Sequence, residues 1–306
     1  MGLLTLLLVA FAGFAAQLVD GGLGMGFGAT SMTILTATAM APATASAVVN
    51  TAQLGTTLAS GLSHWKFGNV EWRIVATIGI PGAIGSFVGA TFLSRLSLDA
   101  AQPLTATILA AIGLLLLIRF ARTRVDEQLK KRQESRPLLL GLGTLGGFIS
   151  ASGGAGWGPV TTSALLTRGR ITPRRIVGTV SAAEFLVTIA AVIGFIFGLW
   201  EEMVANLAAA LALMIGGVIG APIAAWAISR LNSALLGGAV GTVLMVLNVP
   251  KVLDFLGVEN TAVLVAVRVI ILVVGLWLSI SGARRRRRAA AENPPVDRTL
   301  SAPPTR

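Results

Sequence analysis

The sequence predicts an all-α polytopic membrane protein made of two inverted-topology repeats. Of its 306 residues, 54% are apolar and only 12% are charged, whereas soluble domains carry about a quarter charged residues. The apolar residues come in runs of about 17 to 25, the length at which a helix crosses a hydrocarbon core of roughly 30 Å. A Gly-rich motif also occurs once in each half of the chain. These observations exclude a water-soluble fold and favour spanning helices over a barrel.

Five apolar segments come before a basic central stretch, and their lengths indicate their roles. Leu3–Val19 is long enough to span and lacks the basic residues that begin a signal peptide, so we expect a retained helix. Ala29–Ala41 is too short to span, so a broken or re-entrant helix is expected there. The remaining segments of this half are predicted full spans: Thr44–Leu62, Ile74–Leu93 and Pro103–Ile118.

Six apolar segments follow the basic stretch. Val160–Thr167 is short, like Ala29–Ala41, and is the second candidate for a broken or re-entrant helix. Leu235–Val249 is expected to be an extra helix of the second half. The others are predicted helices: Leu138–Ile149, Ile176–Leu199, Met203–Ile228 and Thr261–Ile280. In all, the sequence predicts about 10–11 helical segments.

The distribution of charge divides the chain into four regions. Nine of the eleven net positive charges lie in Arg119–Arg136 and Arg284–Arg306, and the positive-inside rule places such segments in the cytoplasm. We therefore expect a multi-pass protein of the cytoplasmic (inner) membrane with a cytoplasmic C-terminus. The predicted regions are a first transmembrane repeat (1–119), a basic cytoplasmic loop (120–137), a second transmembrane repeat with one extra helix (138–283), and a basic, disordered cytoplasmic tail (284–306).

The internal repeat rests on blocks that recur in the same order. The sequence GGLGMG begins at Gly21 and is followed by Thr30 and Ser31, and GGAGWG begins at Gly153 and is followed by Thr162 and Ser163. Pro42 then matches Pro173, and the stretch 82–96 matches 217–231. When spans are counted from the basic segments, equivalent loops fall on opposite faces of the membrane. The repeats are therefore predicted to be inverted.

Each repeat supplies a Gly-rich turn that leads into a short segment bearing Thr and Ser. In transporters with inverted repeats, the N-termini of broken helices point backbone N–H groups at an anion near the membrane midplane. The alternative is that the glycines serve only close helix packing. A dinucleotide site is disfavoured, because no βαβ unit surrounds the motif. The substrate-binding residues predicted from these turns are Gly22, Gly24, Thr30, Ser31, Gly154, Gly156, Thr162 and Ser163.

The next helix of each repeat carries a polar stripe. Asn50, Gln53 and Thr57 share one helix face, and their repeat equivalents are Ser181, Glu184 and Thr188. Such residues can act as hydrogen-bonding links between helices. The symmetry instead favours two stripes that face one cavity, with Asn50, Gln53 and Ser181 contacting the substrate.

Two carboxylic acids are candidates for proton coupling. An ionisable group near the middle of a membrane helix is costly and marks an ion or proton pathway, which points to Glu184. Because burial disfavours the charged form, we expect Glu184 to hold a proton while an anion is bound and to release it when the site empties. Asp20, at the first Gly-rich turn, is either a second proton-coupling group or a cap for the segment that follows.

Composition excludes several other functions. The chain has no cysteine and one histidine, His64, so neither a Cys/His metal cluster nor another cofactor site is expected. The basic segments lack interleaved aromatic residues, which argues against nucleic acid. The expected partners are a small anionic substrate and membrane lipids, and association into a homo-oligomer is left open. A membrane enzyme is disfavoured because it would need a second acid or base near Glu184, and a structural subunit would not need two polar stripes.

Three stretches carry a resemblance to a known family: DGGLGMG from Asp20, GGAGWGP from Gly153 and TPRRIVGT from Thr172. They resemble the sulfite exporter TauE/SafE family of bacterial and archaeal membrane proteins, and the resemblance extends over nearly all of residues 1–283. It implies transport of small sulfur oxyanions and organosulfonates such as sulfite or sulfoacetate. Phe27, where the second copy has Pro159, and the extra apolar segment depart from the usual pattern and leave the substrate identity open.

We therefore expect a secondary transporter that exports such an anion, coupled to protons. An inside-negative potential drives an anion outward at about 2.3 kcal/mol per charge per 100 mV, so uptake would need a coupled ion. An importer or an uncoupled channel for the same anions is the alternative, and the pH dependence of the flux would separate these.

Overall fold

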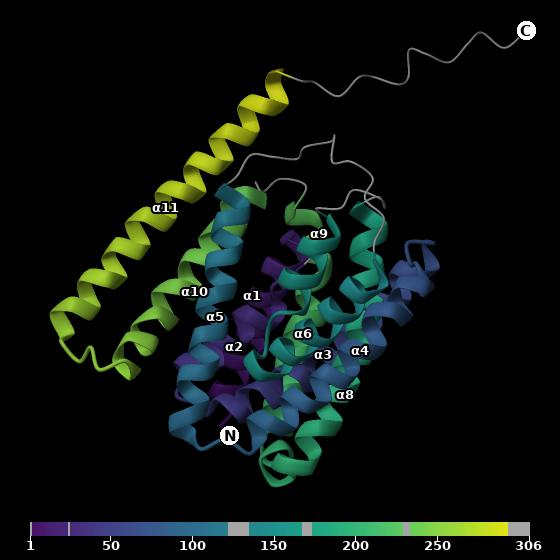
Figure 1. Cartoon of the computed structure of the whole chain (residues 1–306), viewed down its shortest axis with the longest axis horizontal. Coiled ribbons are helices and arrows are strands. Elements are labelled where there is room, and N and C mark those ends of the chain that lie inside the picture. The colour runs from purple at the N-terminus through teal and green to yellow at the C-terminus, as the bar shows by residue number, and fades with distance from the viewer. Residues whose placement is uncertain (1, 24, 122–134, 167–172, 229–232, 293–306) are drawn as a thin grey trace, which may run out of the picture.

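The computed structural model describes residues 2–23, 25–121, 135–166, 173–228 and 233–292, and within these ranges the regular elements are all helices (Figure 1). Six of them are long and apolar enough to cross a membrane: α1 (Leu3–Leu23), α4 (Trp72–Ser94), α5 (Leu98–Ala121), α8 (Pro173–Ala205), α10 (Ser233–Phe255) and α11 (Thr261–Glu292). The prediction of an all-α polytopic membrane protein is confirmed.

Other helices complete the described part of the fold. α3 (Pro42–Lys66) carries the first polar stripe, and α6 (Arg136–Gly153) and α9 (Leu207–Ile228) complete the packed bundle. α2 (Phe27–Ala37) has 11 residues, which at 1.5 Å per residue cover about half of the hydrocarbon core. Its counterpart begins as a short π-helix, η1 (Gly158–Thr162), and continues into α7 (Ser163–Leu166). Both segments predicted to be too short for a span therefore form short helices.

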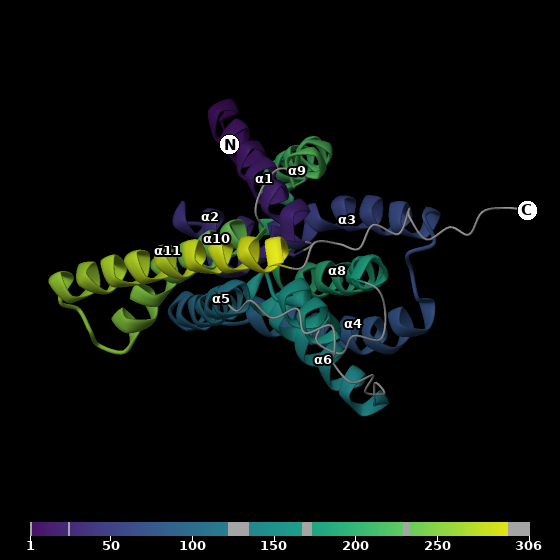
Figure 2. The ribbon, with the colours of Figure 1, turned by 90° about the horizontal axis from the view of Figure 1, so that it is seen from above.

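Helices of the two halves pack against each other in a reciprocal pattern. α1, which begins the first half, packs on α9 of the second half, and α6, which begins the second half, packs on α4 of the first (Figure 2). α3 packs on α8, and α5 packs on α10. The repeat-equivalent Gly85 and Gly220 lie against the backbones of α6 and α1, because small residues let membrane helices approach closely. This exchange is the packing that a two-fold relation would produce, and the inverted orientation itself stays a prediction.

The predicted extra helix, Leu235–Val249, lies within α10, and its assignment as the helix without a counterpart stays a prediction. α10 packs on α5, with Gly241 and Gly113 backbone to backbone. α11 packs mainly on α10 and lies at the edge of the bundle, with 11% of its spanning stretch buried (Figures 1 and 2).

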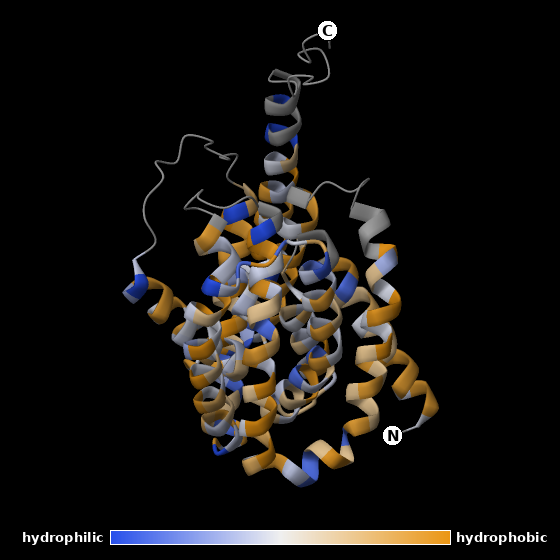
Figure 3. Ribbon diagram, turned by 90° about the vertical axis from the view of Figure 1, so that its right-hand side faces the viewer, coloured by the Kyte–Doolittle hydropathy of each residue, from blue (hydrophilic) through white to orange (hydrophobic). Residues whose placement is uncertain are grey.

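Charged residues mark the two ends of the bundle, while the helix surfaces are largely apolar (Figure 3). An ion pair of 2.8 Å between Arg175 Nη1 and Glu71 Oε1 joins the start of α8 to the connection between α3 and α4. The ends of α5 and α11 lie at the same face (Figure 1). We call this face the basic end, which includes Lys66, Arg73, Arg119, Arg136 and Arg175. The opposite face is called the acidic end, and its acidic residues are Asp99, Glu201, Glu202, Asp254 and Glu259.

Candidate functional site

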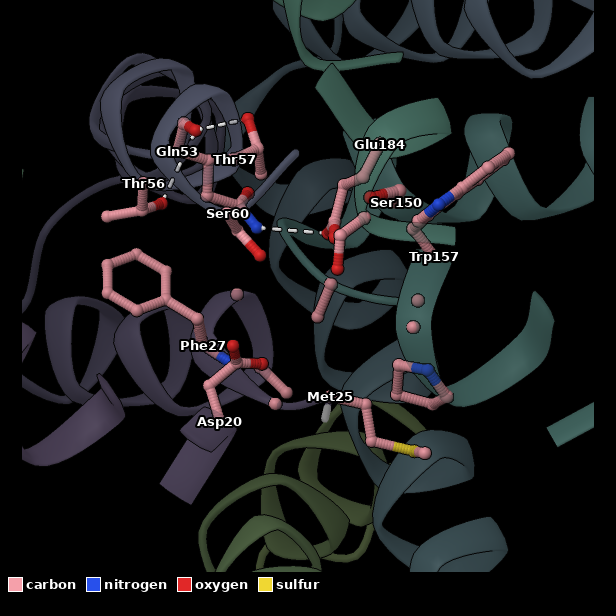
Figure 4. Close-up of a pocket in the computed structure, with 18 of the residues that line it drawn as sticks. Asp20, Met25, Phe27, Gln53, Thr56, Thr57, Ser60, Ser150, Trp157 and Glu184 are labelled. Atoms are coloured by element: carbon pink, nitrogen blue, oxygen red, sulfur yellow. Dashed lines mark hydrogen bonds between the residues drawn. The ribbon is translucent and has the colours of Figure 1, made fainter. Parts of the chain in front are cut away.

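A small cavity of about 70 Å³ lies where the two halves meet (Figure 4). A water molecule needs roughly 10–15 Å³ in the same measure, so the cavity has room for a few waters or one small oxyanion. We call it the central cavity, and its lining residues are Gln17, Asp20, Met25, Gly26, Phe27, Gly28, Ala29, Gln53, Thr56, Thr57, Ser60, Ser150, Ala155, Gly156, Trp157, Gly158, Pro159, Ser181 and Glu184.

The first Gly-rich turn brings Asp20 to the start of α2. Gly26 has a φ of 137°, a backbone conformation that only glycine adopts readily. This turn directs the chain back so that Asp20 Oδ1 accepts a hydrogen bond of 3.3 Å from the backbone N–H of Phe27, the first residue of α2. Asp20 therefore caps α2 and also lines the central cavity.

The second Gly-rich turn forms the opposite wall of the cavity. Gly154 and Gly156 have φ values of 65° and 145°, and η1 begins directly afterwards at Gly158. Trp157 is fully buried, and its indole Nε1 donates a hydrogen bond of 3.1 Å to Val180 O on α8, which anchors the turn. The start of η1 presents the positive end of its backbone dipole to the cavity.

The two polar stripes meet at one point. Gln53 Nε2 on α3 donates a hydrogen bond of 3.4 Å to Glu184 Oε1 on α8, and these residues are repeat equivalents (Figure 4). The neighbouring hydroxyls of Thr57 and Thr188 donate to their own helices, at Gln53 O and Glu184 O respectively. Asn50 turns into α3 and donates to Ser46 O. Contact between the stripes therefore centres on the Gln53–Glu184 pair.

Among the described residues that line the central cavity, two carry carboxyl groups and none is Lys, Arg or His. Asp20 and Glu184 come from different halves and approach the cavity from different sides (Figure 4). Like charges at close range in a low-dielectric site repel strongly, so an anion would enter most readily when these carboxyl groups carry protons. The other polar groups that line the cavity are amides and hydroxyls: Gln17, Gln53, Thr56, Thr57, Ser60, Ser150 and Ser181.

The structure brings together only some of the predicted site residues. Those that line the central cavity are Asp20, Gln53, Gly156, Ser181 and Glu184. The predicted residues that do not line it are Thr30, Ser31, Asn50, Gly154, Thr162 and Ser163; Gly24 lies outside the described residues, and the surroundings of Gly22 are likewise not described. Ser163 instead accepts a hydrogen bond of 2.5 Å from Arg119 Nη1 at the end of α5. The binding and coupling roles of all these residues stay predictions.

Sequence reasoning missed several residues at or near the cavity. Gln17 lies one turn before Asp20 on α1, so its i, i+3 spacing from Asp20 was a usable signal. Ser60 likewise continues the face of α3 beyond Thr57. Arg119 seemed to belong only to the basic central stretch, yet its Nη1 reaches both Ser163 Oγ and, at 3.2 Å, the sulfur of the cavity-lining Met25. No local pattern indicates that link, because it joins the two halves.

Comparison with known proteins gives a consistent result. The model of the family described as "Sulfite exporter TauE/SafE" matches residues 9–250. The chain is 43% identical over 264 residues to the probable membrane transporter protein YtnM of Bacillus subtilis (strain 168), which covers 84% of this chain and 86% of that protein. It is 28% identical over 169 residues to the probable membrane transporter protein YdhB of the same organism, with 54% and 68% covered. No solved structure matches the chain at a significant level.

Proposed function

Because the chain belongs to the sulfite exporter TauE/SafE family of membrane transporters, we propose that it exports a small sulfur oxyanion or organosulfonate and that Glu184 carries a coupled proton. The observation that carries the proposal is the composition of the central cavity. Two carboxyl groups, the starts of two short helices and several amide and hydroxyl groups converge there.

An oxyanion matches the neutral groups of this lining. Amide and hydroxyl donors can each hydrogen-bond an anion oxygen, and the dipole ends of α2 and η1 favour negative charge. The start of η1 is the better end for the anion. Asp20 already occupies the start of α2, whereas the equivalent of Asp20 in the second half is Ser152, whose hydroxyl donates to Gly89 O.

The carboxyl groups provide the coupling. Gln53 holds Glu184 at the cavity, and repulsion between an anion and an ionised carboxylate favours the protonated form while the substrate is bound. When the anion leaves, the proton is released. This cycle links the flux to a pH difference across the membrane, a link that an uncoupled channel lacks.

Export is the direction favoured by the family description and by the electrical gradient. An inside-negative potential of 100 mV drives a monovalent anion outward with about 2.3 kcal/mol. The inverted repeats, the cytoplasmic position of the basic end and the location in the inner membrane belong to the same proposal. The positive-inside rule supports them.

The test is radiolabelled sulfite flux in proteoliposomes that contain the purified protein, measured with and without a pH gradient. We expect saturable flux that the pH gradient changes at least about fivefold, and loss of that response in Glu184→Gln. Glu202→Gln is the matched control, because it makes the same change at the exposed end of the same helix. No flux above empty liposomes would refute sulfite as a substrate, and flux that is indifferent to pH in every variant would refute the coupling.

A further inference from the structure

A second, larger cavity of about 470 Å³ opens at the acidic end, where α2 finishes. The ends of α2 and α10 and the starts of α3 and α5 surround it (Figure 1). We call it the acidic-end cavity. Its polar side chains include Lys251, Asn248 and Asp254 of α10 and Asp99 and Gln102 of α5.

α2 connects the two cavities. Its first residues, Phe27 to Ala29, line the central cavity, and Thr36 near its other end lines the acidic-end cavity. Between them the hydroxyl oxygens of Thr30, Ser31 and Thr33 are buried and have no hydrogen-bond partner. An unsatisfied buried polar group costs about 1–3 kcal/mol, and native proteins rarely leave several together. A polar ligand that passes along α2 would explain these three groups.

The cavities also approach each other at the end of α6. Thr105 is buried, lines the acidic-end cavity and donates a hydrogen bond of 3.5 Å to Ser152 O. Ser152 lies directly before the second Gly-rich turn, whose Ala155 and Gly156 line the central cavity. A few residues of α6 and its turn therefore separate the two spaces on this side.

The acidic-end cavity contains a cationic side chain, which the described lining of the central cavity does not. Lys251 is the cation among its lining residues, and among the described residues no ion pair within 4.0 Å joins Lys251 to Asp99 or Asp254. Asn248, one turn closer to the bundle interior, is buried at 1% exposure. Lys251, Asp99 and Asp254 are all exposed, but Asp254 lies about one turn nearer the end of α10 than Lys251. An anion that moves outward along α10 would therefore meet Asn248 and Lys251 before Asp254.

From this arrangement we propose that the acidic-end cavity is a second anion site, at which Lys251 and Asn248 receive the substrate along the hydroxyls of α2 before release. The site rests on the proposed function and takes the same class of ligand, a small sulfur oxyanion or sulfonate. The exposed acids at its mouth keep the binding weak, and weak binding is what release requires.

The first test uses the absence of native cysteine. Thr33→Cys is exposed to a membrane-impermeant methanethiosulfonate reagent that carries a sulfonate, added from the acidic-end side of sealed vesicles. Ala45→Cys is the control, because Ala45 is fully buried in the apolar core. We expect Thr33→Cys to react at least about tenfold faster. Equal rates would overturn the path along α2.

The second test compares Lys251→Gln with Arg95→Gln, which removes another cation near the acidic end that lines neither cavity. In sulfite-loaded and sulfite-free proteoliposomes of defined orientation, Lys251→Gln should raise the half-saturating sulfite concentration at the acidic-end side at least fivefold. The value at the basic-end side should stay within twofold of wild type. If the wild type transports sulfite and Lys251→Gln leaves the half-saturating concentration at the acidic-end side unchanged, the second site alone is overturned. If the wild type shows no flux, the proposed function on which the site rests is overturned.

Discussion

Each Gly-rich turn contains a glycine with a strongly positive φ, and the two turns differ in charge. These glycines, Gly26 and Gly156, have φ values of 137° and 145°, do not occupy equivalent repeat positions, and each precedes a short helix that begins at the central cavity. In the first turn Asp20 caps α2. In the second turn the equivalent residue is Ser152, whose hydroxyl donates to Gly89 O of α4. In both turns a positive-φ glycine brings the chain to the cavity, and single residues determine the charge there.

The same contrast recurs on the helices that follow. α3 places Gln53 at the position where α8 places Glu184, and the two side chains hydrogen-bond each other. Each half therefore gives one carboxyl group to the cavity, but at positions that are not equivalent. This comparison shows how a duplicated scaffold can hold one asymmetric site, since symmetric carboxyl groups at all four positions would repel one another.

The largest effect is expected from a variant that removes the difference in charge between the two turns. Asp20→Ala removes a charged cap and a cavity carboxyl group, and hydrogen bonds to charged groups are worth about 1.5–3 kcal/mol. We expect the initial rate of sulfite flux in proteoliposomes to fall at least about tenfold. Ser152→Ala, the equivalent change in the second turn, should stay within about twofold of wild type. Equal losses in both variants would mean that the turns are functionally alike.

A smaller effect is expected when the carboxyl group and the amide are exchanged between α8 and α3. Glu184→Gln combined with Gln53→Glu keeps one carboxyl group and one amide at the same contact. Because the pair can still hydrogen-bond, we expect the double variant to recover the pH-gradient response to within about threefold of wild type, a penalty of less than about 1 kcal/mol. Gradient-dependent flux is the measurement. A double variant no better than Glu184→Gln would show that Glu184 acts only from α8.

The smallest effect tests what the turns share. Gly26→Ala and Gly156→Ala each force a side chain into a positive-φ conformation, which costs about 1–3 kcal/mol. We expect both variants to lower the thermal unfolding temperature in detergent, and Gly156→Ala to lower it more, because its added Cβ would lie 2.6 Å from Ile149 Cγ2, against 3.1 Å from Val19 Cγ1 at Gly26. Gly141→Ala is the control, because it lies on α6 with open space around it and should not destabilise the protein. A drop in only one of the two turn variants would contradict the shared role of the turns.

Much of the fold could be predicted from the sequence because membrane insertion depends on local composition. Runs of apolar residues located the six helices that are long and apolar enough to cross a membrane, although the predicted span Thr44–Leu62 lies in α3, which is not one of them. The short lengths of Ala29–Ala41 and Val160–Thr167 predicted the two short helices. The assignment of Leu235–Val249 as the extra helix stays a prediction, because packing contacts alone do not define repeat equivalents. For the site, Glu184 stood out as an acid within a span, whereas Thr30, Ser31 and Asn50 were predicted from spacing alone and do not line the central cavity.

The sequence by itself determined the spanning segments, the repeated Gly-rich turns and the presence of an acid within a membrane helix. Burial of apolar surface is non-directional, and a positive φ at a glycine is a local requirement. Spanning segments and Gly-rich turns can therefore both be recognised from short stretches of sequence. Only the tertiary structure decided that Gln53 meets Glu184, that Asp20 caps α2, that Arg119 reaches Ser163 and that Lys251 lies in a second cavity. These contacts depend on how each helix is rotated and shifted against helices of the other half, and close packing of the whole bundle sets those positions.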